Sequence, residues 1–190
     1  MAKGFILKDN LTKDTLLKVA AFGFIAVAAL TSPYFLHTVA RGYFKEKTKE
    51  MRLKRARKLR ELQKRKLLEF KEMSDGSVKI TLTHLGKKLV RQYKLEEMAI
   101  AKPKQWDRKW RIIIYDIPIS KSNARDVFRE KIKKLGLYQL QKSIWVSPYE
   151  CLPEIEFLCS IFDIDMDNCV YYFKTPEIPK EKQIKKYFSL

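Results

Sequence analysis

The stretch WRIIIYDIP, from Trp110 to Pro118, decides how the second half of this chain folds. Its apolar and mostly β-branched run from Ile112 to Tyr115 predicts a buried strand. Pro118 lacks a backbone donor and helps to end that strand, while Asp116 stands alone at its exposed end. A lone carboxylate in this place is either a cap of the following loop or a ligand of a metal ion.

The segments after this strand continue the pattern of a small mixed domain. Their periodicity predicts, in order, strand Trp110–Ile117, helix Ser122–Gly136, strands Leu137–Gln141 and Ser143–Pro148, helix Pro153–Phe162 and strand Cys169–Phe173. The order βαββαβ predicts a ferredoxin-like antiparallel sheet with two helices on one face. The other face or an edge is left for a partner, and the basic tail 176–190 ends in Phe188 and Leu190, which are apolar enough to dock on a neighbour.

Positive charge is concentrated in the middle of the chain. The formal net charge is +18, and residues 41–104 hold 21 basic and 8 acidic side chains, a local net of +13. A charge of this density suits a phosphate backbone or an anionic membrane surface better than it suits an ordinary solvated face.

The basic segment belongs to a predicted helical region. Helices are expected over Lys13–Leu30 and Pro33–Lys47, followed by a third within KEMRLKRARKLRELQKRKLLEF (residues 49–70). In this third segment an apolar residue recurs every three positions, at Leu53, Ala56, Leu59 and Leu62. The pattern indicates a helix with one narrow buried edge and a basic remainder.

A hairpin and a closing helix complete the first half. Apolar residues alternate over Leu68–Phe70 and Val78–Leu82, and Asp75-Gly76 between them is a strong turn signal. A helix over His84–Tyr93 follows. Three helices, a hairpin and a closing helix predict a winged helix-turn-helix, with a helical bundle and an incidental hairpin as the alternative.

The expected fold class is therefore α+β, an N-terminal winged helix-turn-helix followed by a ferredoxin-like βαββαβ domain. We expect a DNA-binding domain over 1–101, a linker over 102–108, a dimerisation domain over 109–175 and a C-terminal tail over 176–190. The basic third helix would enter the major groove of double-stranded DNA and the hairpin would serve as its wing. The expected DNA contacts are Arg52, Lys54, Arg55, Arg57 and Lys58 on the helix and Lys71 and Lys79 on the wing.

The sequence argues against a membrane protein. The uninterrupted apolar part of Val19–Ala40 runs only from Val19 to Leu30, which is shorter than the ~20 residues of a membrane-spanning helix. Ser32-Pro33 then reads as the start of a second helix. Three cysteines without metal-ligand spacing suit a reducing compartment, so we expect a cytoplasmic protein.

Several motifs of the second half resemble a known domain. KWRIIIYDIP, the basic helix ending in LG, and LQKSIWVSPYE resemble the Cas-two-like domain, found in the small CRISPR adaptation subunit and in PaaX-type transcriptional repressors. The likeness covers Trp106–Glu150, and the strand order extends it to Phe173. W-D-x-x-W-R before the first strand and S-I-W-V-S-P after it are closer to the PaaX side, as is a winged helix ahead of this domain.

The resemblance implies two functions. The first is a homodimeric DNA-binding transcriptional regulator of PaaX type. The second is a CRISPR adaptation subunit with an integrase partner, or a magnesium-dependent endonuclease acting on RNA or DNA. In the Cas-two-like family Asp116 matches the metal-binding and catalytic aspartate, one from each subunit of the dimer, and Mg²⁺ would be the cofactor. Many members of that family have more acidic and arginine residues after the aspartate than the loop PISKSNAR has here, so whether the chain is an enzyme is open.

Overall fold

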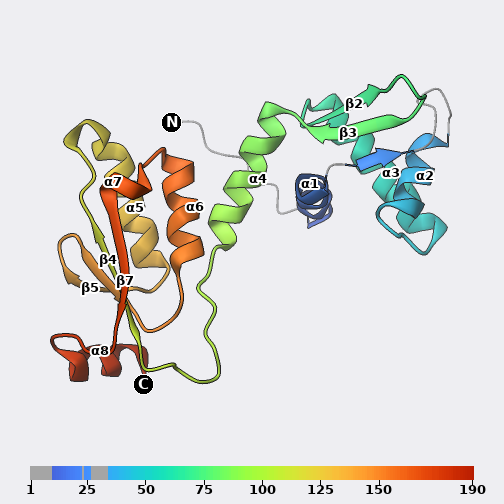
Figure 1. Cartoon of the computed structure of the whole chain (residues 1–190). Helices are drawn as coiled ribbons and strands as arrows, with labels where there is room; N and C mark the ends of the chain where they lie inside the picture. Colours follow the sequence, from blue (N-terminus) through green and yellow to red (C-terminus); the bar gives the residue numbers. More distant parts are fainter. Residues whose placement is uncertain (1–9, 23, 27–33) are drawn as a thin grey trace. The chain divides into compact units, whose positions relative to one another are not determined.

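The computed structural model describes residues 10–22, 24–26 and 34–190 and divides the chain into two compact units, 1–96 and 97–190. Both units combine helices with an antiparallel sheet, as expected of an α+β protein (Figure 1). The division falls between Glu96 and Glu97, near the end of a helix, whereas the sequence places a linker at 102–108. Each unit is described by itself.

The first unit has the element order of a winged helix. Its elements are α1 (Asn10–Phe22), β1 (Phe24–Ala26), α2 (Phe35–Gly42), α3 (Lys49–Lys64), β2 (Leu68–Glu72), β3 (Val78–Leu82) and α4 (His84–Glu97). The three strands form an antiparallel sheet in the order β1-β3-β2. The hairpin β2–β3 turns at Gly76, whose φ of 76° suits glycine, and the Ser77 amide donates to the Asp75 carboxylate at 2.9 Å.

Two helix predictions in this unit need correction. The helix expected over Lys13–Leu30 ends at Phe22, and Phe24–Ala26 pair with β3, with Phe24 opposite Ile80. A segment of three residues is too short to be a stable strand by itself, and it forms one here because it pairs with the edge of β3. Residues 23 and 27–33, which include the predicted start at Ser32-Pro33, lie outside the described residues.

The second helix is also shorter than Pro33–Lys47. It runs from Phe35 to Gly42, and a turn over residues 43–48 connects it to α3. Lys45 in this turn has a left-handed φ of 54°, which a continuing helix does not allow. The turn is packed into the unit, because Phe44 and Glu46 are buried.

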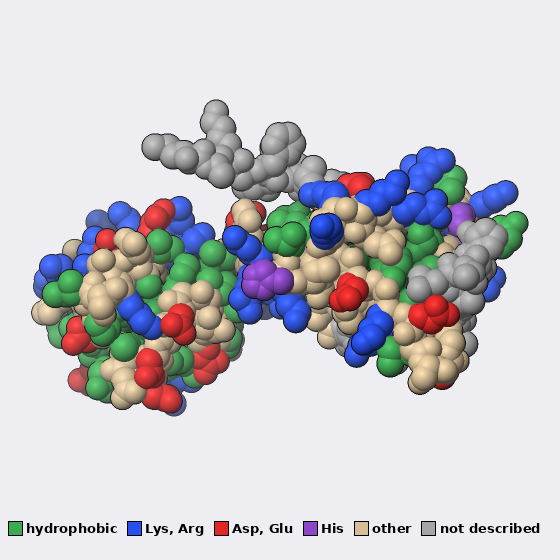
Figure 2. All heavy atoms as spheres, turned by 90° about the horizontal axis from the view of Figure 1, so that it is seen from above, with side chains coloured by type: hydrophobic (Ala, Val, Ile, Leu, Met, Phe, Trp, Pro, Cys, Tyr) green, Lys and Arg blue, Asp and Glu red, His purple; other side chains and the backbone are tan. Residues whose placement is uncertain are grey.

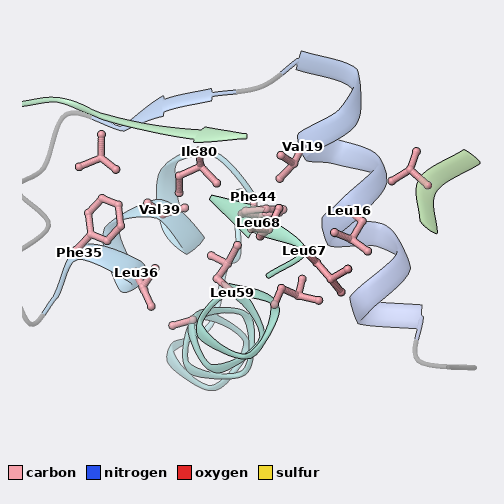
Figure 3. Packing of buried hydrophobic residues seen from close by; sticks show 14 of the residues in the cluster. Leu16, Val19, Phe35, Leu36, Val39, Phe44, Leu59, Leu67, Leu68 and Ile80 are labelled. Carbon is pink, nitrogen blue, oxygen red and sulfur yellow. The ribbon is translucent and has the colours of Figure 1, made fainter. Parts of the chain in front are cut away.

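The core of the first unit lies between its helices and the hairpin (Figure 3). Leu16 and Val19 come from α1, Leu59 from α3, and Ile80 from β3, and each is 2 % exposed or less. Leu59 belongs to the three-residue stripe read from the sequence, of which Ala56 and Leu62 are also buried. Leu53, the first member of that stripe, is 37 % exposed because the N-terminal turn of α3 extends past the core.

The second unit contains the expected ferredoxin-like plan and two additional helices, α7 and α8. Its elements are β4 (Trp110–Tyr115), the 3-10 turn η1 (Ile119–Lys121), α5 (Ser122–Lys134), β5 (Tyr138–Gln141), β6 (Ile144–Ser147), α6 (Leu152–Phe162), α7 (Met166–Cys169), β7 (Val170–Thr175) and α8 (Glu181–Phe188). The antiparallel sheet has the order β5-β6-β4-β7. β4 is central, with Ile113 opposite Trp145 of β6 and Tyr172 of β7.

The two faces of this sheet are covered differently. On one face Tyr115 packs edge-on against Phe128 of α5, with ring centroids 5.2 Å apart. On the other, Ile184 of α8 packs against Trp110 and Ile112 and is fully buried. Phe188, which we expected to dock on a neighbour, instead packs against Trp110 of its own sheet, with ring centroids 6.4 Å apart, whereas Leu190 is exposed.

The motif W-D-x-x-W-R stabilises the entry to β4. Nη1 and Nη2 of Arg111 each bind a different carboxylate oxygen of Asp107 at 2.7 Å, and Nη1 also donates to the Pro148 carbonyl at 2.8 Å. Trp106 and Trp110 pack together with centroids 4.7 Å apart. The W-D-x-x-W-R motif therefore has a structural role at the start of β4, and we call it the W-D-x-x-W-R clamp.

Within the described ranges, no helix has the length and apolarity that crossing a membrane requires.

Candidate nucleic-acid interface

Helix α3 has one buried side and one side that faces solvent. Thr48 caps its N-terminus, accepting a hydrogen bond from the Met51 amide at 3.2 Å. Ala56, Leu59 and Leu62 hold its inner side in the core. This apolar packing helps to fix the direction in which the outer side faces.

Four cations form a stripe along that outer side. They follow helical spacing and are all exposed: Lys54, Arg57, Arg60 and Lys64. We call these four residues the α3 stripe. Lys54 contacts Glu50 at 2.7 Å, whereas Arg57 has no ion pair or hydrogen bond within the described part of the chain. Lys54 and Arg57 were predicted from the sequence, and Arg60 and Lys64 could have been found by continuing the same spacing.

Arg55 does not belong to the interface, and its prediction as a DNA contact needs correction. It is 4 % exposed, and its Nε and Nη2 bind Glu46 Oε1 at 2.9 and 2.7 Å. Nη1 donates to the Thr15 hydroxyl at 2.6 Å, and Nη2 lies 2.8 Å from the Asp14 carboxylate. The guanidinium ties α3 to α1 and to the α2–α3 turn, because the helix turns residue 55 inward.

Arg52 and Lys58 are partly engaged within the protein. Arg52 donates from Nε to the Glu46 carbonyl and from Nη2 to the Lys47 carbonyl, each at 2.9 Å. Lys58 contacts Glu61 at 2.6 Å, and its side chain is only 15 % exposed. Both remain cations at the edge of the α3 stripe, but neither has a side chain freely available to DNA.

The wing presents two further cations side by side. Lys71 of β2 and Lys79 of β3 are directly opposite each other in the hairpin, and both are exposed. Like charges in a cross-strand pair oppose hairpin formation, so this position is unfavourable in the absence of an anion. The arrangement suits a phosphate next to the wing.

A groove of about 450 Å³ lies between α2 and the first turns of α3. It is lined by Tyr34, His37, Thr38, Arg41, Lys49, Arg52 and Leu53. The sequence reading missed Arg41 and Lys49 as interface residues. The sequence offered one signal for them, since Arg41 lies in the last turn of α2 and Lys49 in the first turn of α3.

Figure 2 shows Lys and Arg side chains over much of the visible upper margin of the first unit.

Asp116 lies in the second unit, directly after β4. Its amide donates to the Cys169 carbonyl at 2.9 Å, and its side chain is exposed. Within the described part of the chain its carboxylate makes no hydrogen bond to residues 120–122, where a capping role would place one. A pocket of about 200 Å³ beside it is lined by Tyr115, Asp116, Ile117, Arg125, Arg129, Lys142 and Ser143.

These residues do not suit a Mg²⁺ site within one protomer. Asp116 is the only carboxylate that lines the pocket, and three cations line it as well. Across the described ranges, no group of three or more His, Cys, Asp or Glu side chains is placed to hold a metal ion. Mg²⁺ requires six oxygen ligands, and cations next to it disfavour its binding.

Comparison with known families agrees with the geometry of the second unit. The model of the PaaX protein central Cas2-like domain matches residues 103–186, from the W-D-x-x-W-R clamp into α8. No curated protein matches the chain. Residues 103–186 therefore match the PaaX-type, Cas2-like domain family.

Proposed function

We propose that this protein is a homodimeric DNA-binding transcriptional regulator of PaaX type. The observation that carries the proposal is the α3 stripe, a row of exposed cations on the third helix of a winged helix. The PaaX-type Cas2-like domain that follows it supports a regulator. In helix-turn-helix proteins this helix enters the major groove, where arginine reads guanine and lysine binds phosphate.

The remaining cations of the first unit would contact the DNA backbone on either side of α3. Lys71 and Lys79 of the wing would contact the backbone on one side of the groove. Arg41 and Lys49, which line the groove between α2 and α3, would contact it on the other. Phosphate contacts fix the register of the protein on DNA, and the α3 stripe then contacts the bases.

Affinity for DNA tests the proposal directly. Fluorescence anisotropy would compare a duplex from the region upstream of the gene with a scrambled duplex, at several salt concentrations. Lys54→Ala with Arg57→Ala should weaken binding by roughly tenfold or more and lower the salt slope by about two.

A matched control is available on α8. Lys182 is also exposed and has no ion pair within the described residues, so Lys182→Ala should leave the affinity and the salt slope unchanged. Equal loss in both variants, or no binding by the parent, would contradict the proposal. Equal affinity of the parent for both duplexes would contradict an operator-specific regulator.

We place the dimer contact at β7. The sheet has two edge strands, and β5 is short, irregular between Gln139 and Gln141, and packed against α8 through Tyr138 and Tyr187. β7 is a regular six-residue strand with Tyr171 59 % and Phe173 46 % exposed. An open regular edge with exposed aromatic side chains favours pairing with a second copy.

Sedimentation equilibrium at micromolar concentration tests this contact. Tyr171→Lys with Phe173→Lys should convert a dimer into a monomer and lower DNA affinity. Ile119→Lys is a matched control, because Ile119 is an exposed apolar residue of η1 and not of β7. A parent that is monomeric with and without DNA would rule the dimer out.

A CRISPR adaptation subunit or a magnesium-dependent endonuclease is the second candidate. It is favoured by the exposed carboxylate of Asp116, and it needs a second copy to supply another oxygen donor. Incubation of parent and Asp116→Ala protein with RNA and DNA in the presence of Mg²⁺ tests it. Cleavage by the parent that is lost in the variant would support a nuclease, and co-purification with an integrase would support an adaptation subunit.

A further inference from the structure

The pocket beside Asp116 carries an excess of positive charge. Arg125 and Arg129 come from α5, one turn apart, and Lys142 comes from the β5–β6 turn. Against these three cations the lining contains the single carboxylate of Asp116. At neutral pH the lining therefore has a surplus of two positive charges.

The cations of this pocket are poorly compensated by their neighbours. Arg125 lies 3.8 Å from the carboxylate of Asp126, the next residue in the chain, which is a long contact. The side chains of Arg129 and Lys142 make no ion pair or hydrogen bond within the described part of the chain. Two like charges spaced i, i+4 on a helix oppose its formation, so an anion between them would stabilise α5.

The shape and chemistry of the pocket suit one small anionic group. Its volume is about 200 Å³, and it is bounded by the ends of β4 and β6 and by one face of α5. Arginine presents a planar fork of donors that matches two oxygens of a phosphate, and lysine adds a point charge. Ser143 adds a hydroxyl to the lining.

We propose that this pocket binds a phosphate group, held by Arg125, Arg129 and Lys142, in place of the metal ion implied for Asp116. Asp116 then acts against the ligand, because its carboxylate repels the phosphate oxygens and limits the affinity. The proposal concerns the second unit alone and does not depend on DNA binding by α3.

Replacement of Asp116 distinguishes a phosphate-binding pocket from a metal-binding one. In isothermal titration calorimetry of the full chain with inorganic phosphate, Asp116→Asn should bind phosphate several-fold more tightly than the parent. A metal site predicts the reverse pattern: the parent would bind Mg²⁺ and the variant would lose it. Mg²⁺ binding by the parent in the absence of phosphate, lost in Asp116→Asn, would overturn the proposal.

Replacement of the arginines tests the cations directly. Arg125→Gln with Arg129→Gln should weaken phosphate binding by about tenfold for each charge-assisted contact that is lost. Lys182→Gln removes an exposed charge elsewhere on the same unit and should change nothing. Circular dichroism would verify that the double variant is folded.

The source of the phosphate is decided by competition. If the pocket takes backbone phosphates, saturating inorganic phosphate should weaken DNA binding by the parent more than by the double variant. If it takes a small phosphorylated compound, a nucleoside 5′-monophosphate should bind the parent more tightly than inorganic phosphate does and leave DNA binding unchanged. Absence of phosphate binding by the parent, or binding that the double arginine variant retains, would overturn the proposal.

Discussion

Arg55 binds the same carboxylate oxygen of Glu46 with two of its nitrogens, Nε at 2.9 Å and Nη2 at 2.7 Å. Both side chains are buried, and the guanidinium also lies over the Phe44 ring, 4.5 Å from its centroid. This contact joins the α2–α3 turn to α3 and sets the direction in which the α3 stripe faces. The most basic helix of the protein is thus positioned by one of its own arginines.

Replacement of Arg55 should destabilise the first unit. Arg55→Met would leave the Glu46 carboxylate buried without a partner, which costs about 3 kcal/mol or more. Arg55→Lys should recover only part of this, because an ammonium group cannot reproduce the forked contact. Urea unfolding measures both, and Arg57→Met on the solvent side is the control that should change stability by less than about 0.5 kcal/mol.

A glycine to alanine change at the start of α4 should also be costly. Gly86 is buried, and a Cβ at this position would overlap the carbonyl oxygen of Leu67. Gly86→Ala should therefore lower the free energy of unfolding by about 1–3 kcal/mol. At Gly42 an added Cβ would meet nothing within 4 Å, so Gly42→Ala should leave the stability unchanged or raise it slightly. Thermal unfolding of both variants measures the difference.

The clamp before β4 should make the second unit sensitive to acid. The hydrogen bonds from Arg111 lower the pKa of Asp107 from 3.8 to about 2. A lowered folded-state pKa stabilises the fold above the unfolded pKa, and this contribution is lost as the pH falls from about 4 to 2. Asp107→Asn should reduce stability at neutral pH and flatten this acid-dependent loss, measured by fluorescence of the tryptophans.

Glu150 should contribute to the same acid transition. Burial raises its pKa, but hydrogen bonds from Lys174 and the Tyr172 hydroxyl outweigh this effect and bring the pKa from 4.5 to about 2. Glu150→Gln with Asp107→Asn should flatten the acid profile further than either change alone. A profile that is unchanged in both variants would show that other carboxylates govern acid unfolding.

Helix α8 should be needed for the stability of the sheet that it covers. Ile184 is fully buried against Trp110 and Val146. Ile184→Ala should cost about 2–4 kcal/mol, whereas Lys182→Ala on the exposed side of the same helix should cost less than about 0.5 kcal/mol. Equal effects in a denaturant titration would mean that α8 does not contribute to the core in solution.

Much of the architecture could be read from local patterns. The run Ile112–Tyr115, the turn at Asp75-Gly76 and the order of the later elements each depend on neighbouring residues, and the described structure contains all of them. Boundaries were less predictable, since the end of α1 at Phe22 depends on β3 recruiting Phe24–Ala26 into its sheet. That pairing joins residues far apart in the chain.

The candidate sites could likewise be predicted only in part from the sequence. The sequence by itself determined that the third helix is basic, that a wing follows it, and that Asp116 ends a central strand. Only the tertiary structure decided that Arg55 turns inward to Glu46 and that Arg125, Arg129 and Lys142 line one pocket with Asp116. The physical reason is that charge is a property of the residue, whereas burial and the choice of partner are set by the segments that pack against it.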